Sequence, residues 1–139
     1  MEMPSLEPLS FREQCRQAID RIDTYMDKAK ARGSLQKTYT SESKYQTKLL
    51  QTFKQLRLQD VMWWTKISDR YIKGVPDILC CVAGKFVFFE LKVPGNVASP
   101  LQRYNMEKIK EVGGEGCIAI NLERPLKIIK SMLETYVTQ

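Results

Sequence analysis

The spacing of apolar residues predicts two amphipathic helices in the first part of the chain. The first begins after Ser10, which forms a capping box with Glu13, and it ends at Gly33. A polar linker to Ser41 leads to a second helix over residues 42–58. The apolar positions are Phe11, Cys15, Ile19, Ile22, Met26 and Ala29 in the first helix and Tyr45, Leu49, Leu50, Phe53 and Leu56 in the second. We expect the first helix either to pack on its own domain or to form part of a subunit interface.

The rest of the chain predicts a sheet flanked by helices. Side chains alternate over residues 60–67, so one of Trp63 and Trp64 should face the core, while the other packs under a helix or is free to stack on a base. A hairpin over residues 78–89, a helix over 99–112, a strand over 117–121 and a helix over 125–137 follow. The helix between two strands forms a βαβ crossover, which implies a parallel pair.

This element order predicts an α/β fold, with a mixed β-sheet and helices on both of its faces. We expect a single domain of restriction-endonuclease-like architecture over residues 42–139. Residues 1–41 would add an N-terminal amphipathic helix and a linker.

The hairpin brings two carboxylates together. If Ala83 and Gly84 form a two-residue loop, Asp77 falls opposite Glu90, and Lys92 points to the same face of the sheet. A three-residue loop would shift the pairing by one and separate the carboxylates. With the two-residue loop, two carboxylates and an ammonium share one face, and we expect this site at one edge of the sheet.

Such a group suits a hard cation and a phosphate ligand. Mg²⁺ prefers oxygen ligands and is usually held by one or two carboxylates together with phosphate oxygens. A lysine beside it can orient the attacking water and offset charge on the phosphate. The chain contains no histidine, which disfavours His-dependent nucleases, Ser-His-Asp hydrolases and His-ligated zinc enzymes.

The length of the chain, its cysteines and its charge restrict the class of protein further. The 139 residues suffice for one domain with a real core, and no apolar run approaches a membrane span or a signal peptide, so we expect a soluble, cytoplasmic protein. The four cysteines lack CxxC spacing, which favours buried thiols. Residues 1–32 are neutral, so the whole net charge of +6 lies on residues 33–139, as expected of a segment that meets a polyanion. Solubility is the alternative explanation for this charge.

Several ordered features resemble the PD-(D/E)XK nuclease superfamily. Its signature is matched by Pro76-Asp77 and, after the hairpin, by Glu90-Leu91-Lys92. The wider pattern, over about residues 42–120, is similar to the VRR-NUC branch, whose small stand-alone members occur in phages. That pattern adds an acidic residue at a helix start, a strand, Gly-Val-Pro-Asp, a Ser-Pro-x-Gln helix start and Gly-Gly before a last strand.

The resemblance implies an endodeoxyribonuclease that depends on Mg²⁺ or Mn²⁺. Asp77 and Glu90 would hold the metal with the Leu91 carbonyl, and Lys92 would align or activate the water. Related nucleases include Holliday junction resolvases, which act as two-fold dimers, so DNA and a second copy of the chain are the implied partners. The rival hypotheses are a nucleic-acid-binding module of the same fold without cleavage, and an RNase.

Two further residues have both a structural and a catalytic explanation. Glu42 lies in a first helical turn, where the helix dipole favours a carboxylate; the resemblance implies that it binds the metal, often through water. Gln102 stands at the third position of a helix capped by Ser99; the resemblance implies that it orients substrate or water.

Basic and aromatic residues before the motif are candidates for contact with nucleic acid. The loop over residues 68–74 should lie at the rim of the site, where cations can bind phosphate. Solvated surface charges are the alternative. The candidates are Lys66, Arg70, Tyr71 and Lys73.

Overall fold

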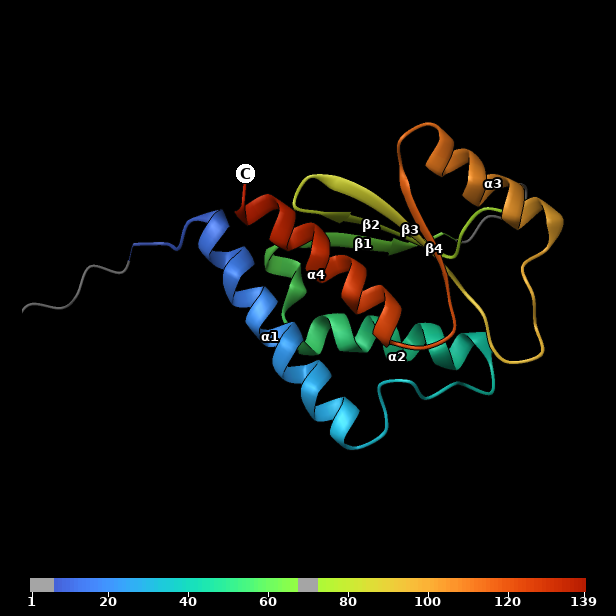
Figure 1. The fold of residues 1–139 in the computed structure, drawn as a ribbon, viewed down its shortest axis with the longest axis horizontal. Helices are drawn as coiled ribbons and strands as arrows, with labels where there is room; N and C mark the ends of the chain where they lie inside the picture. The colour runs from blue at the N-terminus through green and yellow to red at the C-terminus, as the bar shows by residue number, and fades with distance from the viewer. Residues whose placement is uncertain (1–6, 68–72) are drawn as a thin grey trace, which may run out of the picture.

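The computed structural model describes residues 7–67 and 73–139, which form four α-helices and four β-strands (Figure 1). The helices are α1 (Phe11–Ala31), α2 (Glu42–Gln55), α3 (Pro100–Glu111) and α4 (Glu123–Val137). The strands are β1 (Met62–Lys66), β2 (Ile78–Val82), β3 (Lys85–Leu91) and β4 (Glu115–Ala119), and a short 3₁₀ helix, η1 (Leu58–Asp60), follows α2. The predicted order of elements is confirmed.

The strands form one mixed sheet in the order β1-β2-β3-β4. The β1–β2 and β2–β3 pairs are antiparallel, whereas β3 and β4 run parallel and are joined through α3. The expected βαβ crossover is therefore present. A parallel pair needs a long crossover connection, and α3 forms most of the connection between β3 and β4.

The hairpin has the predicted register. Val82 pairs with Lys85 and Ile78 with Phe89 across a two-residue turn. Ala83 and Gly84 both have positive φ, 48° and 86°, as a type I′ turn requires. This turn matches the twist of the strands, so the pairing continues without a shift to the residues just beyond Ile78 and Phe89.

Side chains of the two sheet faces meet different helices. The face that carries Ile78, Val87 and Phe89 packs into one core with α1, α2 and α4. The opposite face is covered in part by α3, whose Met106 lies so close to Gly116 that a Cβ atom there would clash. Helices thus flank both faces, as predicted.

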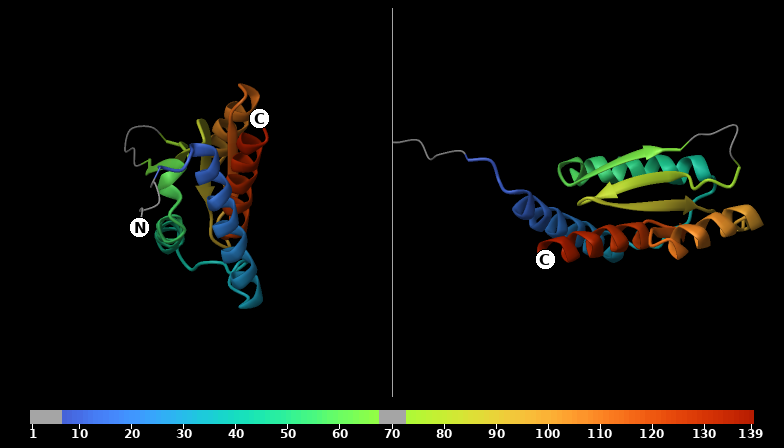
Figure 2. Two further views of the ribbon diagram at one scale, coloured as in Figure 1. Left: turned by 90° about the vertical axis from the view of Figure 1, so that its left-hand side faces the viewer. Right: turned by 90° about the horizontal axis from the view of Figure 1, so that it is seen from above.

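α1 packs on its own chain. It runs antiparallel to α4, and Figures 1 and 2 show the two helices side by side. The ring of Phe11 meets Tyr136 edge-on with centroids 5.1 Å apart, and Lys130 pairs with Asp23 at 2.5 Å. The expectation that this helix packs on its own domain is confirmed. The division of the chain into residues 1–41 and 42–139 stays a prediction.

Some predicted boundaries and contacts were wrong. α2 ends at Gln55 and not at residue 58, because Arg57 adopts the left-handed conformation with φ 53°. Trp64 packs edge-on against Phe53, with ring centroids 5.3 Å apart, so it is the tryptophan of the core side. Trp63 is 56% exposed and does not lie under a helix.

The last strand and helix each begin two residues earlier than predicted. β4 starts at Glu115, because it pairs with Val87 of β3, and α4 starts at Glu123, whose backbone N–H donates to the Asn121 side chain at 3.1 Å. The four cysteines are free thiols; Cys15, Cys80 and Cys117 are buried, as expected, whereas Cys81 is half-buried. Within the described part of the chain, no helix has the length and apolar character needed to cross a bilayer.

Ala83 is predicted to limit stability through its left-handed backbone. Ala83→Asn should raise the free energy of unfolding by roughly 0.5 kcal/mol, because Asn tolerates this conformation better than Ala. Gly84→Ala should lower the free energy of unfolding by about 1 kcal/mol, because alanine tolerates positive φ less well than glycine. Urea denaturation of both variants tests the turn; equal effects of the two substitutions would contradict it.

Candidate active site

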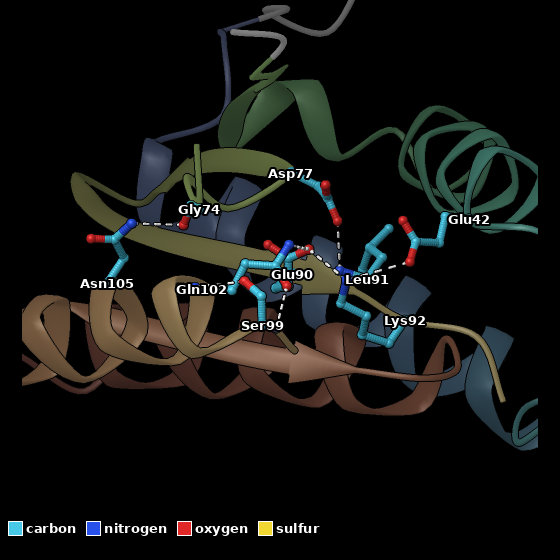
Figure 3. Close-up of polar contacts among 9 residues, drawn as sticks. All are labelled: Glu42, Gly74, Asp77, Glu90, Leu91, Lys92, Ser99, Gln102 and Asn105. Carbon is cyan, nitrogen blue, oxygen red and sulfur yellow. Dashed lines mark hydrogen bonds and ion pairs between the residues drawn. The ribbon is translucent and has the colours of Figure 1, made fainter. Parts of the chain in front are cut away.

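Six predicted site residues converge where β2 begins and β3 ends (Figure 3). Asp77 precedes β2, Glu90 and Leu91 end β3, and Lys92 follows directly. The N-termini of α2 and α3 add Glu42 and Gln102. We expected the site at one edge of the sheet. It lies instead at the ends of β2 and β3, which are the two central strands. β4 pairs with β3 and is itself the edge strand on that side.

Glu90 is the most deeply buried of the charged residues of the site, at 1% exposure. Its Oε1 accepts a hydrogen bond from Gln102 Nε2 at 3.1 Å, whereas the buried Oε2 has no hydrogen-bond partner. Burial is the main cause that raises the pKa of Glu90 to about 8, followed by Asp77, which repels the ionised form and accepts a hydrogen bond from the protonated form. The Lys92 ammonium acts in the opposite direction.

Lys92 links two carboxylates. Its buried side chain places Nζ 3.4 Å from Oε1 of Glu42 and 3.6 Å from Oε1 of Glu90. The ammonium offsets part of the negative charge that would otherwise collect between α2 and β3. Glu42 therefore has a role besides its favourable place at the start of α2: it is held toward the site by Lys92.

Asp77 is fixed across the hairpin. Its Oδ2 accepts a hydrogen bond from the backbone N–H of Leu91 at 2.8 Å, and its own carbonyl accepts one from Ile67 N–H at 2.8 Å. These two bonds hold the carboxylate beside Glu90 although Asp77 lies just outside β2. The Leu91 carbonyl as a metal ligand stays a prediction.

Gln102 caps α3, as the sequence suggested, and its side chain also reaches the site; its role toward substrate or water stays a prediction. Its Oε1 accepts from Ser99 N–H at 2.9 Å, and Ser99 Oγ accepts from Gln102 N–H at 3.1 Å, which completes a capping box. The amide nitrogen is left free for Glu90. The cap therefore orients the very side chain that reaches the site.

The donor set fits a hard divalent cation. Over residues 7–67 and 73–139, no three carboxylate or thiol side chains form a ready-made metal cluster. Two adjacent carboxylates with one unpartnered buried oxygen, on Glu90, are nevertheless what Mg²⁺ needs from a protein when water and phosphate supply the other ligands. Glu42 is the third carboxylate nearby, held by Lys92.

The predicted nucleic-acid contacts are only partly described. Lys66 and Lys73 are exposed, at the end of β1 and just before Gly74, while Arg70 and Tyr71 lie outside the described residues. One positioning contact escaped the sequence pattern: Asn105 donates to the Gly74 carbonyl at 2.8 Å. That bond ties α3 to the segment that leads into Asp77, and no local spacing signals it.

Comparison with solved structures identifies the fold of the protein. No family model and no curated protein matches the sequence. A solved structure described as "VRR_NUC domain" matches with a TM-score of 0.51 and 22% identity, over 70% of this chain and 99% of that chain. The protein therefore has the fold of a VRR_NUC domain, which is the restriction-endonuclease-like α/β fold that the ordered sequence features predicted.

Glu90 should make the metal-free protein less stable at high pH. The folded state holds the proton with a pKa of about 8, against 4.5 for an ordinary glutamate, so the free energy of unfolding falls as the pH rises between these values. Glu90→Gln removes this dependence and leaves an amide that can donate to Asp77. In EDTA, the variant should gain roughly 2 kcal/mol or more on the wild type between pH 5 and pH 9.

The matched control for this experiment is Glu107→Gln, on the exposed side of α3. It should follow the wild type at every pH. A parallel pH profile of Glu90→Gln and wild type would show that the Glu90 carboxyl ionises normally.

Proposed function

We propose that the protein is a divalent-metal-dependent endodeoxyribonuclease. The observation that carries the proposal is the buried, unpartnered Oε2 of Glu90, which lies beside Asp77 and within the reach of Lys92. Such an oxygen is costly in a folded protein unless a proton or a cation satisfies it. The VRR_NUC-like fold suggests a nuclease independently of this observation.

The residues have distinct roles in the proposal. Asp77 and Glu90 hold the ion together with the Leu91 carbonyl, and Glu42 completes the outer shell. A divalent ion at this place supplies water activation and neutralises charge that develops on the phosphate. Gln102 keeps the Glu90 carboxylate in position through its hydrogen bond to Oε1.

Lys92 supplies the fixed positive charge. It orients the attacking water for in-line displacement at phosphorus, in which a new P–O bond forms as the bond to the leaving sugar oxygen breaks. Its ammonium is already offset by two carboxylates, so it is held in place before substrate arrives. No imidazole is present to share this work.

DNA as substrate, a preference for branched DNA such as a Holliday junction, and a homodimer are the finer parts of the proposal. A four-way junction presents two equivalent strands, which a two-fold dimer can engage together. The intact Asp, Glu and Lys set supports an enzyme over a binding module that has lost cleavage. A phage source and a cytoplasmic location rest on the sequence resemblance and composition.

Loss of either charged partner should abolish cleavage. Asp77→Asn keeps an acceptor for the Leu91 N–H, and Lys92→Met keeps the side-chain volume, so both should fold and bind DNA. We expect each to lower the cleavage rate about 100-fold or more. Lys85→Ala, on the exposed hairpin, is the control. Full activity of Asp77→Asn would contradict the assignment.

Metal and substrate are tested in one set of assays. Cleavage of linear duplex, flap, four-way junction and single-stranded DNA, with matched RNA, should require Mg²⁺ or Mn²⁺ and stop in EDTA. We expect DNA to be cut and RNA to be spared. Preferential cutting of RNA would establish the RNase alternative, and light scattering of the protein with and without a junction measures the oligomeric state.

A further inference from the structure

Positive side chains gather on one side of α1, although residues 1–32 have no net charge. Arg21, Lys28 and Arg32 line a hollow between α1 and the end of α2. Asp23 lies on the side of α4, where it pairs with Lys130 at 2.5 Å. The neutral sum of residues 1–32 therefore hides a basic face that points away from α4.

This basic face borders a continuous groove. One hollow of about 530 Å³ and another of about 290 Å³ share Tyr25, Arg32 and Gln55, so they form a single surface feature, which we call the α1–α2 groove. Asp20 is the one acidic residue among those that line it. The basic residues that line it are Arg21, Lys28, Arg32, Lys37, Lys48 and Arg57.

These cations are not neutralised by the protein. In the described ranges 7–67 and 73–139, none of the six forms an ion pair. Arg21 donates instead to the backbone carbonyls of Leu56 at 2.7 Å and Arg57 at 3.2 Å, which fixes its guanidinium at the end of α2. The groove thus keeps an excess of positive charge that can act on a ligand.

Arg57 gives an independent sign of function. It occupies the left-handed position that follows the helix cap, with φ 53°, where glycine is the usual residue. A residue with a Cβ atom strains the backbone there, and strained positions cluster at functional sites. The Arg57 side chain lines the groove.

We propose that the α1–α2 groove binds the phosphate backbone of one arm of the DNA substrate. The inference rests on the proposed nuclease function. At the site itself, Glu42, Asp77 and Glu90 offset the charge of Lys92 and of the proposed metal ion, so the site contributes little net attraction for a polyanion. Cations spread along an open groove fit a linear run of phosphates better than they fit one small anion.

The helix α2 sets the distance between site and groove. Glu42 opens the helix at the site, Lys48 follows six residues later, and Arg57 lies just beyond the C-terminal end (Figure 1). With a rise of about 1.5 Å per residue, α2 spans roughly 20 Å. That is about six base pairs of duplex, so one arm can reach from the site into the groove.

The test compares two triple variants that each remove three exposed positive charges, both in an Asp77→Asn background. Lys28→Gln, Arg32→Gln and Lys48→Gln remove three of the six groove cations, whereas Lys85→Gln, Lys110→Gln and Lys127→Gln lie elsewhere. The probe is a fluorescent 30-base-pair duplex, titrated by anisotropy at several salt concentrations. The groove variant should bind roughly tenfold more weakly and show a salt slope smaller by about 2 to 3, while the control variant stays within about twofold of the parent.

The two proposals fail in different ways. A groove variant that binds like the control variant overturns the groove assignment, even if Asp77-dependent cleavage is found. Groove-dependent binding without any metal-dependent cleavage supports the groove and contradicts the nuclease proposal. In the cleavage-competent chain, the groove variant should raise KM about tenfold with kcat unchanged; an unchanged KM counts against the groove.

Arg57→Gly separates binding from folding. Glycine relieves the left-handed backbone, so the thermal midpoint should be equal to or higher than that of the wild type. DNA binding should nevertheless weaken about threefold with the loss of one phosphate contact. Undiminished binding by this folded variant would overturn the role of Arg57.

Discussion

The register of the β2–β3 hairpin is the constraint on which the site depends. Side chains on a strand alternate faces, so a shift by one residue would send Glu90 into the core with Phe89 on the opposite face. The left-handed Ala83-Gly84 turn prevents this shift. Asp77 then lies beside Glu90, and the Asp77 carboxylate secures the ladder end through the Leu91 N–H. The turn is thus remote from the chemistry but decides its geometry.

Burial of Glu90 is the second organising feature. A carboxylate removed from water needs compensation, and the fold supplies part of it from two elements: Lys92 after β3 and Gln102 in α3. Compensation is incomplete, because Oε2 lacks a partner. A group left in this state binds a cation readily, since the cation replaces both the proton and the missing hydrogen bond. In the nuclease that we propose, the same feature that lowers the stability of the metal-free protein prepares the site for its metal ion.

Placement of charge divides the molecule into two regions with different tasks. Near the site, the carboxylates of Glu42, Asp77 and Glu90 outnumber the ammonium of Lys92. Along the α1–α2 groove, cations dominate and are free of ion pairs in the described part of the chain. The near end of the groove, Lys48, follows Glu42 by about 9 Å along α2, and the far end, Arg57, lies beyond the C-terminus of the helix. Because most of this distance exceeds a Debye length of about 8 Å, screening lets each region keep its own potential.

Much of the local structure could be predicted from the sequence, because its causes act over a few residues. Apolar periodicity located all four helices and all four strands, and the Ser99 cap located the start of α3. Hairpin spacing placed Asp77 opposite Glu90. Errors in the elements themselves were confined to their ends, such as that of α2, where the left-handed Arg57 stops the helix without the glycine that usually marks such a position.

Relations between distant elements were decided by the tertiary structure alone. The sequence by itself determined the elements, the hairpin register and the cluster of Asp77, Glu90 and Lys92, because turn stereochemistry and strand alternation are local. Packing decided that Lys92 bridges Glu42 and Glu90, that α3 is tied to Gly74 through Asn105, and that the basic residues of α1 face α2. Those contacts depend on how helices and sheet fit together around a common core, which no local pattern records.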